Sequence, residues 1–155
     1  MSQNHHQITL RGAIFDAATR GIELAHDRLK ASFEFAEQAR LPGDELKHDL
    51  ERIGVIAVKL REKEASGGGV IEDLHEAQVR IIKAALELCA RTDLAAAKDQ
   101  EGKIAASAIS SLMARAAEIR KFLQEHESKG ISWDETLVAW GIPPASGFSF
   151  TSIRR

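Results

Sequence analysis

Apolar residues recur at alternating intervals of three and four along most of this 155-residue chain. That spacing keeps side chains on one face of an α-helix. It is clearest over 104–123, where six apolar residues share one face: Ala105, Ile109, Leu112, Ala116, Ile119 and Leu123. The pattern predicts a helix that packs against a core.

The same spacing predicts two helices in the first third of the chain. The first covers 10–40 and is stopped by Leu41-Pro42-Gly43, since proline disfavours a helical residue before it. The second begins with Asp44 as its N-cap and ends at Lys63 or Ala65. Ser66 and the three glycines that follow predict a mobile loop after it.

Two more long helices are expected in the second half of the chain. One covers 70–91 and carries two adjacent apolar stripes, so it should be the most buried helix. The other covers 92–129, with Thr92-Asp93 as its N-cap, and runs through Gly102 despite the cost of that glycine. A break at 99–102 is the competing interpretation.

These lengths predict an all-α fold, an antiparallel four-helix bundle with short loops. We expect the bundle to cover 10–129 and to follow a disordered N-terminus over 1–9. Gly130 ends the last long helix, and Ser132 caps a short fifth helix that ends near Trp140. An irregular, aromatic tail completes a docking segment over 130–155.

Composition agrees with a folded, globular or coiled-coil-like protein. Apolar residues make up 44% and charged residues 28%, and the net charge of -2 gives no overall attraction to nucleic acid or anionic membranes. A single cysteine, no signal-like apolar start and no apolar run near 20 residues favour a cytoplasmic protein without a membrane span.

The pattern Glu-x-x-His is the strongest candidate for chemistry. It occurs at Glu23/His26, at Glu45/His48 and at Glu72/His75. On a helix this spacing places both side chains on neighbouring turns, as in di-iron helical bundles. Helical geometry nevertheless puts these pairs at the edge of the apolar stripes or outside them, so a metal site formed by Glu23, His26, Glu72 and His75 is a minor alternative and no cofactor is expected.

Two further chemical candidates are weaker. His26 precedes Lys30 in a run that resembles the His-x-x-Lys-Gly phosphotransfer pattern, but the lysine is one residue late and Ala31 follows it. Cys89 lies among apolar residues, and an apolar setting raises the pKa of a thiol, so we expect an inert core cysteine.

The end of the chain is rich in aromatic residues: Trp133, Trp140, Phe148 and Phe150. They predict either a segment that folds back on the bundle or a docking segment for a partner, because Trp and Arg are favoured interface anchors. A third interpretation is a partial helix-turn-helix over 132–142, with Arg154 and Arg155 on phosphate. Pro143-Pro144 and Gly147 form a poor recognition helix, so nucleic acid binding is the least favoured of the three.

The helix around 104–123 has more apolar and small residues than one core stripe needs. Ala106, Met113 and Ala117 lie beside that stripe, with Ser110 between them. We expect this surplus to be covered by a second helix, either the C-terminal segment or a helix from another subunit. The sequence therefore favours a non-enzymatic protein that acts by self-association or by binding another protein. A multimeric DNA-associated protein and a metal-binding bundle are the alternatives.

Overall fold

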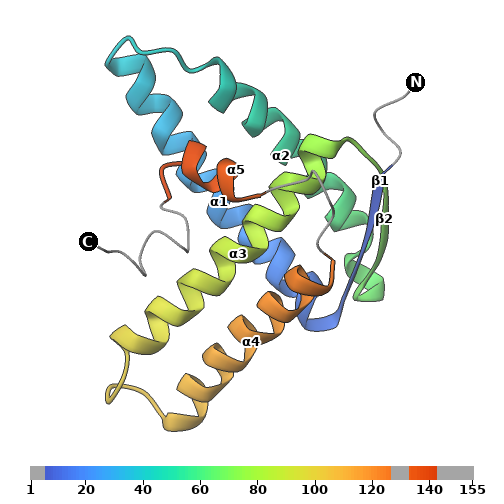
Figure 1. Ribbon diagram of the computed structural model, residues 1–155, viewed down its shortest axis with the longest axis vertical. Helices are drawn as coiled ribbons and strands as arrows, with labels where there is room; N and C mark the ends of the chain where they lie inside the picture. The colour runs from blue at the N-terminus through green and yellow to red at the C-terminus, as the bar shows by residue number, and fades with distance from the viewer. Residues whose placement is uncertain (1–5, 127–132, 143–155) are drawn as a thin grey trace.

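The computed structural model describes residues 6–126 and 133–142 and is mostly helical (Figure 1). The predicted helical class is confirmed, but a small two-stranded sheet was not expected from the sequence. The elements in chain order are β1 (His6–Arg11), α1 (Gly12–Gln38), α2 (Asp44–Glu62), a 3₁₀ turn (Glu64–Ser66), β2 (Gly68–Leu74), α3 (Glu76–Asp99), α4 (Ala106–Glu125) and α5 (Asp134–Ala139).

The two inner helices, α1 and α3, cross in the middle of the molecule (Figure 1). Buried small residues lie near the crossing in both sequences: Ala17, Ala18 and Ala25 within four residues of Gly21 on α1, and Ala84 beside Ala85 on α3. A Cβ atom added to Gly21 would clash with the carbonyl oxygen of Ala85. Small residues therefore allow the close approach of the two backbones.

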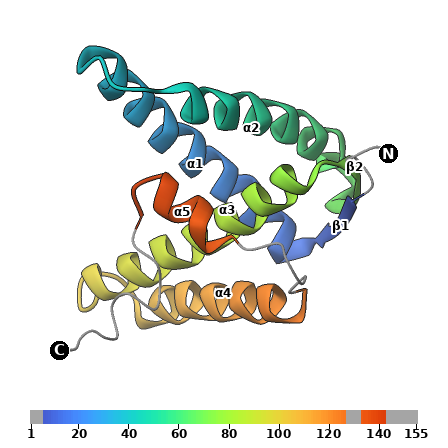
Figure 2. The same ribbon diagram turned by 45° about the horizontal axis from the view of Figure 1, so that its top comes forward.

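Each outer helix packs mainly on one inner helix, α2 on α1 and α4 on α3, with smaller contacts to the other inner helix. The helix α5 lies between the α1–α2 hairpin and the α3–α4 hairpin (Figure 2). As predicted, α3 is the most buried helix, and every residue from 81 to 90 is buried. None of the helices in the described part of the chain is long and apolar enough to cross a bilayer.

The turn between α1 and α2 is a Schellman motif that ends α1 close to the predicted position. Arg40 takes a left-handed conformation with φ 58°, and the Leu41 amide donates to the Ala36 carbonyl at 2.8 Å. The prediction of Asp44 as N-cap is wrong by one residue. Gly43 holds the N-cap position, and Asp44 is the first helical residue.

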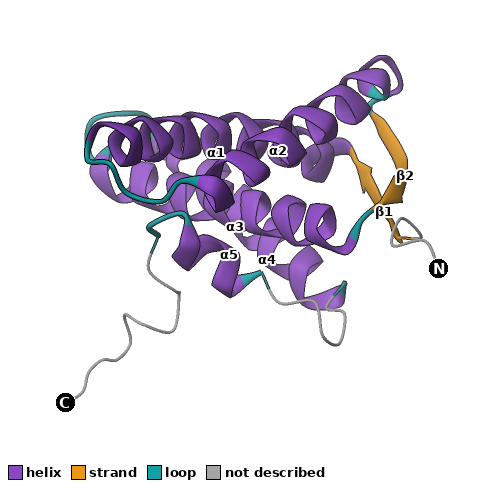
Figure 3. Ribbon diagram, turned by 90° about the horizontal axis from the view of Figure 1, so that it is seen from above, coloured by secondary structure: helices purple, strands orange, loops and turns teal. Residues whose placement is uncertain are grey.

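Antiparallel strands β1 and β2 form a ribbon at one end of the helical layer (Figure 3). The predicted disorder over 1–9 is wrong for residues 6–9, and the predicted helix start at Val70 is wrong as well. Ile8 and Leu10 are buried and alternate with exposed residues, which is the period of a strand. Residues 1–5 lie outside the described part of the chain.

The predicted loop over 66–69 is wrong for its second half: Ser66 and Gly67 belong to a turn, whereas Gly68 and Gly69 are the start of β2. Gly68 has φ 117° and lies so close to the Leu10 carbonyl oxygen that a Cβ atom would clash with it. Only glycine combines that backbone conformation with such a close approach to the neighbouring strand.

The predicted helix over 92–129 is two elements. α3 continues to Asp99, and α4 begins at Ala106 after a turn in which Gly102 has φ 80°. The competing break at 99–102 is therefore confirmed. Thr92 is not an N-cap, because its hydroxyl donates to the Leu88 carbonyl at 2.8 Å in the middle of α3.

We expect Gly21→Ala to lower the free energy of unfolding by about 1–3 kcal/mol, because the added methyl group forces α1 and α3 apart. Gly54→Ala is the matched control. It lies in α2 with open space around its Cβ position, so it should raise stability by about 0.5–1 kcal/mol. Urea unfolding of both variants measures the difference. Equal effects of the two substitutions would contradict the proposed close crossing.

Candidate functional site

The helix α4 buries three residues, Ala116, Ile119 and Leu123, all in its second half. No residue from 106 to 115 is buried, and Ile109 and Leu112, which the sequence assigned to the core stripe, are half-buried. Ala105 is exposed and is the N-cap of the helix. The first half of α4 therefore packs only partly on the rest of the chain.

The structure brings the predicted interface residues of α4 together on one exposed face. Ala106, Met113 and Ala117 are all exposed, with Met113 at 52%. Ser110 lies between them, also exposed, so the four residues follow one another at intervals of four, three and four. We call Ala106, Ser110, Met113 and Ala117 the α4 face.

An ion pair joins α4 to α3. Arg115 donates through Nε and Nη2 to the two carboxylate oxygens of Asp93, both at 2.6 Å. The Asp93 side chain is 5% exposed. This hydrogen-bonded pair raises the pKa of the Arg115 guanidinium, so the arginine stays charged.

A second polar contact fixes the far half of α4. The Glu87 carboxylate, 2% exposed, accepts from Arg120 of α4 at 2.9 Å and from Arg91 of its own helix at 2.8 Å. Lys83 donates to the His126 carbonyl at 2.6 Å, at the C-terminal end of α4, where a cation is favourable. These groups hold α4 at a fixed rotation about its axis.

Sequence reasoning missed this network. The sequence held one signal for these ion pairs: Glu87 and Asp93 belong to the helix with the wide apolar face. An unpaired carboxylate buried on that helix would be costly. That position requires cations from a neighbouring helix. The sequence alone does not tell which arginines supply them.

Cys89 is a buried thiol one turn before Asp93, and the prediction of a core cysteine is confirmed. Burial raises the pKa of the thiol above its ordinary value of 9.0, and the nearby Asp93 charge raises it further. A raised pKa reduces the thiolate fraction, so this cysteine is a poor nucleophile.

The short helix α5 packs against the chain itself. Trp140 is 1% exposed, and its indole Nε1 donates to Asp49 at 3.1 Å. Arg28 of α1 donates to the carbonyl of Gly141, the residue after Trp140, at 3.0 Å. The use of Trp140 as an exposed partner anchor is therefore wrong, because its large apolar ring is already buried in cis.

The remaining C-terminal candidates fall into two groups. Trp133 is half-buried and packs against the core. Phe148, Phe150, Arg154 and Arg155 lie outside the described residues, so they stay sequence-based predictions.

The structure separates the two candidate metal-binding pairs. Glu23 and His26 are exposed on α1, and His26 Nδ1 lies 3.5 Å from Asp27. Glu72 belongs to β2, whereas His75 is the N-cap of α3 and accepts from the Ala77 amide at 3.0 Å. The premise that Glu72 and His75 share one helix is wrong. No group of three or more metal-binding side chains occurs within 6–126 and 133–142.

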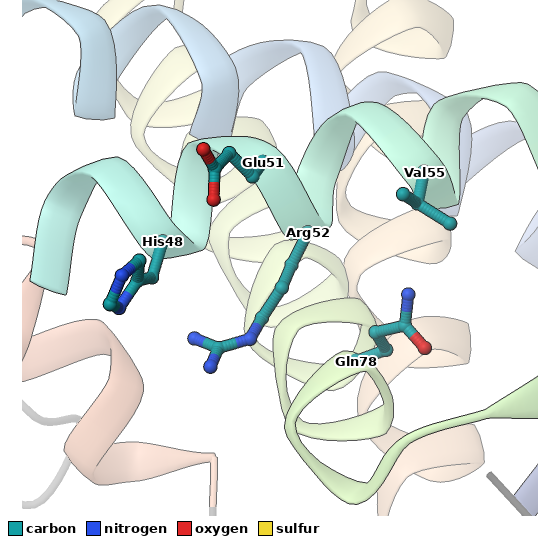
Figure 4. Close-up of a pocket in the computed structure, with 5 residues that line it drawn as sticks. All are labelled: His48, Glu51, Arg52, Val55 and Gln78. Atoms are coloured by element: carbon teal, nitrogen blue, oxygen red, sulfur yellow. The ribbon is translucent and has the colours of Figure 1, made fainter.

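A groove runs between α2 and the start of α3 (Figure 4). One part, of about 320 Å³, is lined by His48, Glu51, Arg52, Val55 and Gln78. Arg52 also lines the neighbouring part, which continues past His75 to α5. The groove was not predicted. The sequence contains one signal for the start of α3 beside this groove, the pattern His75-x-x-Gln78. The Gln78 side chain accepts from the His75 amide, as in a capping box.

Comparison of the chain with protein-family models, with curated proteins and with solved structures returned no match. The functional interpretation therefore depends on the geometry of the described residues.

We expect Arg115→Met to lower the free energy of unfolding by about 3 kcal/mol, because it leaves Asp93 charged and buried without its cation. Lys121→Met removes an exposed cation from the same helix and should change stability by less than about 0.5 kcal/mol. The double variant Asp93→Leu/Arg115→Met should recover most of the loss. Chemical denaturation provides the values, and equal losses in Arg115→Met and Lys121→Met would refute the role of the pair.

We also expect stability to fall as the pH rises above 9.0, the ordinary thiol pKa. Above that pH the unfolded chain loses the Cys89 proton while the folded chain keeps it, so deprotonation favours unfolding. The slope from this one group is at most about 1.4 kcal/mol per pH unit. Urea unfolding between pH 8 and 10 should show a shallower decline for Cys89→Ala than for the native sequence; parallel declines would count against this assignment.

Proposed function

We propose that this protein is a non-enzymatic helical protein that acts by self-association, with the α4 face as the contact between copies. One observation carries the proposal. Residues 104–114 include no charged side chain, although none of those from 106 to 114 is buried. An exposed helix surface in a monomer normally carries charged residues, so an uncharged one favours coverage by a second helix.

The chemistry of the face supports a second copy as the partner. Alanine and serine allow close approach of two helix backbones, and Met113 supplies a flexible apolar contact at the centre. A face without charges pairs with itself across a twofold axis without like-charge repulsion. The intervals of four and three match those of helices that pack in coiled coils.

The proposal includes the arrangement of the helices. We interpret the four long helices as an antiparallel four-helix bundle with α5 as a short fifth helix. In this bundle α4 is an outer helix, fixed by Asp93–Arg115 and Glu87–Arg120. Fixed rotation about the helix axis is what keeps the α4 face directed outward.

The test is the molar mass in solution. Light scattering after size exclusion, across a range of concentrations, should give a dimer or a larger oligomer for the native sequence. Ala106→Glu/Ala117→Glu should weaken association by at least about tenfold, because like charges meet at the contact. The far-ultraviolet circular dichroism of this double variant should match that of the native protein.

Ser111→Glu is the matched control for the double variant. It lies on the same helix and is exposed, but it is about 140° around the axis from Ala106. It should associate like the native protein. A strict monomer at high concentration, or an equal loss with Ser111→Glu, would refute the α4 face as the contact.

A further inference from the structure

A cavity of about 170 Å³ lies between α1 and α2, away from the α4 face. Its apolar walls include Phe15 and Ile22 of α1 and Leu60 of α2, each almost fully buried. An apolar cavity of about 150 Å³ is large enough to bind benzene. The space therefore suits a compact ring or a branched aliphatic group.

Thr19 also lines this cavity, and its hydroxyl is unusual among the described residues. The Oγ1 atom is buried and has no hydrogen-bond partner. Two other helical hydroxyl groups bond to the carbonyl four residues earlier, that of Thr92 to Leu88 and that of Ser111 to Ser107. A buried hydroxyl without a partner is costly, so the missing partner needs an explanation.

We propose that this cavity binds a small neutral molecule that combines an apolar ring or branched body with one hydroxyl group, and that Thr19 bonds to that hydroxyl. The buried walls named above are apolar and match an apolar body, and the Thr19 hydroxyl supplies one hydrogen-bonding group beside them. Charged groups occur only toward the exposed positions Glu23, Arg61 and Glu64. Two carboxylates against one guanidinium disfavour an anionic ligand.

Phenol, benzene and benzoate are the probes for this site. Two-dimensional ¹H–¹⁵N NMR titrations of the full chain should show saturable shifts with phenol around Thr19 and Leu60. Benzene should bind at least about fivefold more weakly, the effect of one hydrogen bond, and benzoate should not bind. Absence of saturable shifts with phenol, or equal affinity for phenol and benzene, would overturn the proposal.

Variants separate the hydroxyl from the cavity. Thr19→Val keeps the side-chain shape, so it should weaken phenol about fivefold and leave benzene unchanged. Ala57→Leu adds bulk at the cavity wall and should abolish binding of both. Thr9→Val, on the exposed face of β1, is the control and should bind like the native protein.

Thermal unfolding verifies that each variant is folded before titration. Native phenol affinity in folded Thr19→Val, or retained binding in folded Ala57→Leu, would refute the assignment. Neither result bears on self-association, which depends on a different helix.

Discussion

The close crossing of α1 and α3 is the contact on which the rest of this structure depends. Gly21 lies against the Ala85 carbonyl, and alanines occupy the neighbouring positions on both helices. Backbones that approach so closely exclude large side chains from the crossing itself. The larger apolar residues then lie above and below it, where α2, α4, α5 and the β-ribbon cover them. The outer helices are therefore accessory to the inner pair, and each has one principal neighbour.

Polar contacts act together with apolar burial to place α4. None of the residues in its first half is fully buried, and Asp93 and Glu87 of α3 hold the helix through two arginines. A buried ion pair adds little net stability, since desolvation of both charges offsets their attraction. It does penalise any other rotation of α4, because a rotated helix would leave carboxylates buried without cations. The main effect of these ion pairs is thus to fix the orientation of α4. A contact surface on an outer helix requires such a fixed orientation.

The sequence predicted the helices well because their apolar residues repeat over many turns. It failed where the signal was short or depended on distant residues. In β1, two buried residues alternate with exposed ones, too few to outweigh the helical pattern that follows. The start of β2 was hidden by its glycines, whose role depends on the Leu10 carbonyl of the other strand. The ion pairs were not predictable because their partners are 22 and 33 residues apart in sequence. For the aromatic C-terminal segment, composition favoured folding in cis over docking in trans without excluding docking, and the buried position and partners of Trp140 decide for folding in cis at this residue.

Packing is incomplete at the two outer helices, α2 and α4. The proposed ligand site lies beside α2, and the proposed contact between copies lies on α4. An outer helix with one principal inner neighbour cannot bury all of its surface, and side chains of fixed size cannot fill every space beside a close crossing. Beside α2 the unfilled space is a cavity that opens toward the exposed positions Glu23, Arg61 and Glu64 and is lined by the unpaired Thr19 hydroxyl. On α4 the unburied surface faces solvent, and it is the uncharged α4 face. The cavity and the uncharged, exposed α4 face are thus two places where packing around the inner pair of α1 and α3 is incomplete.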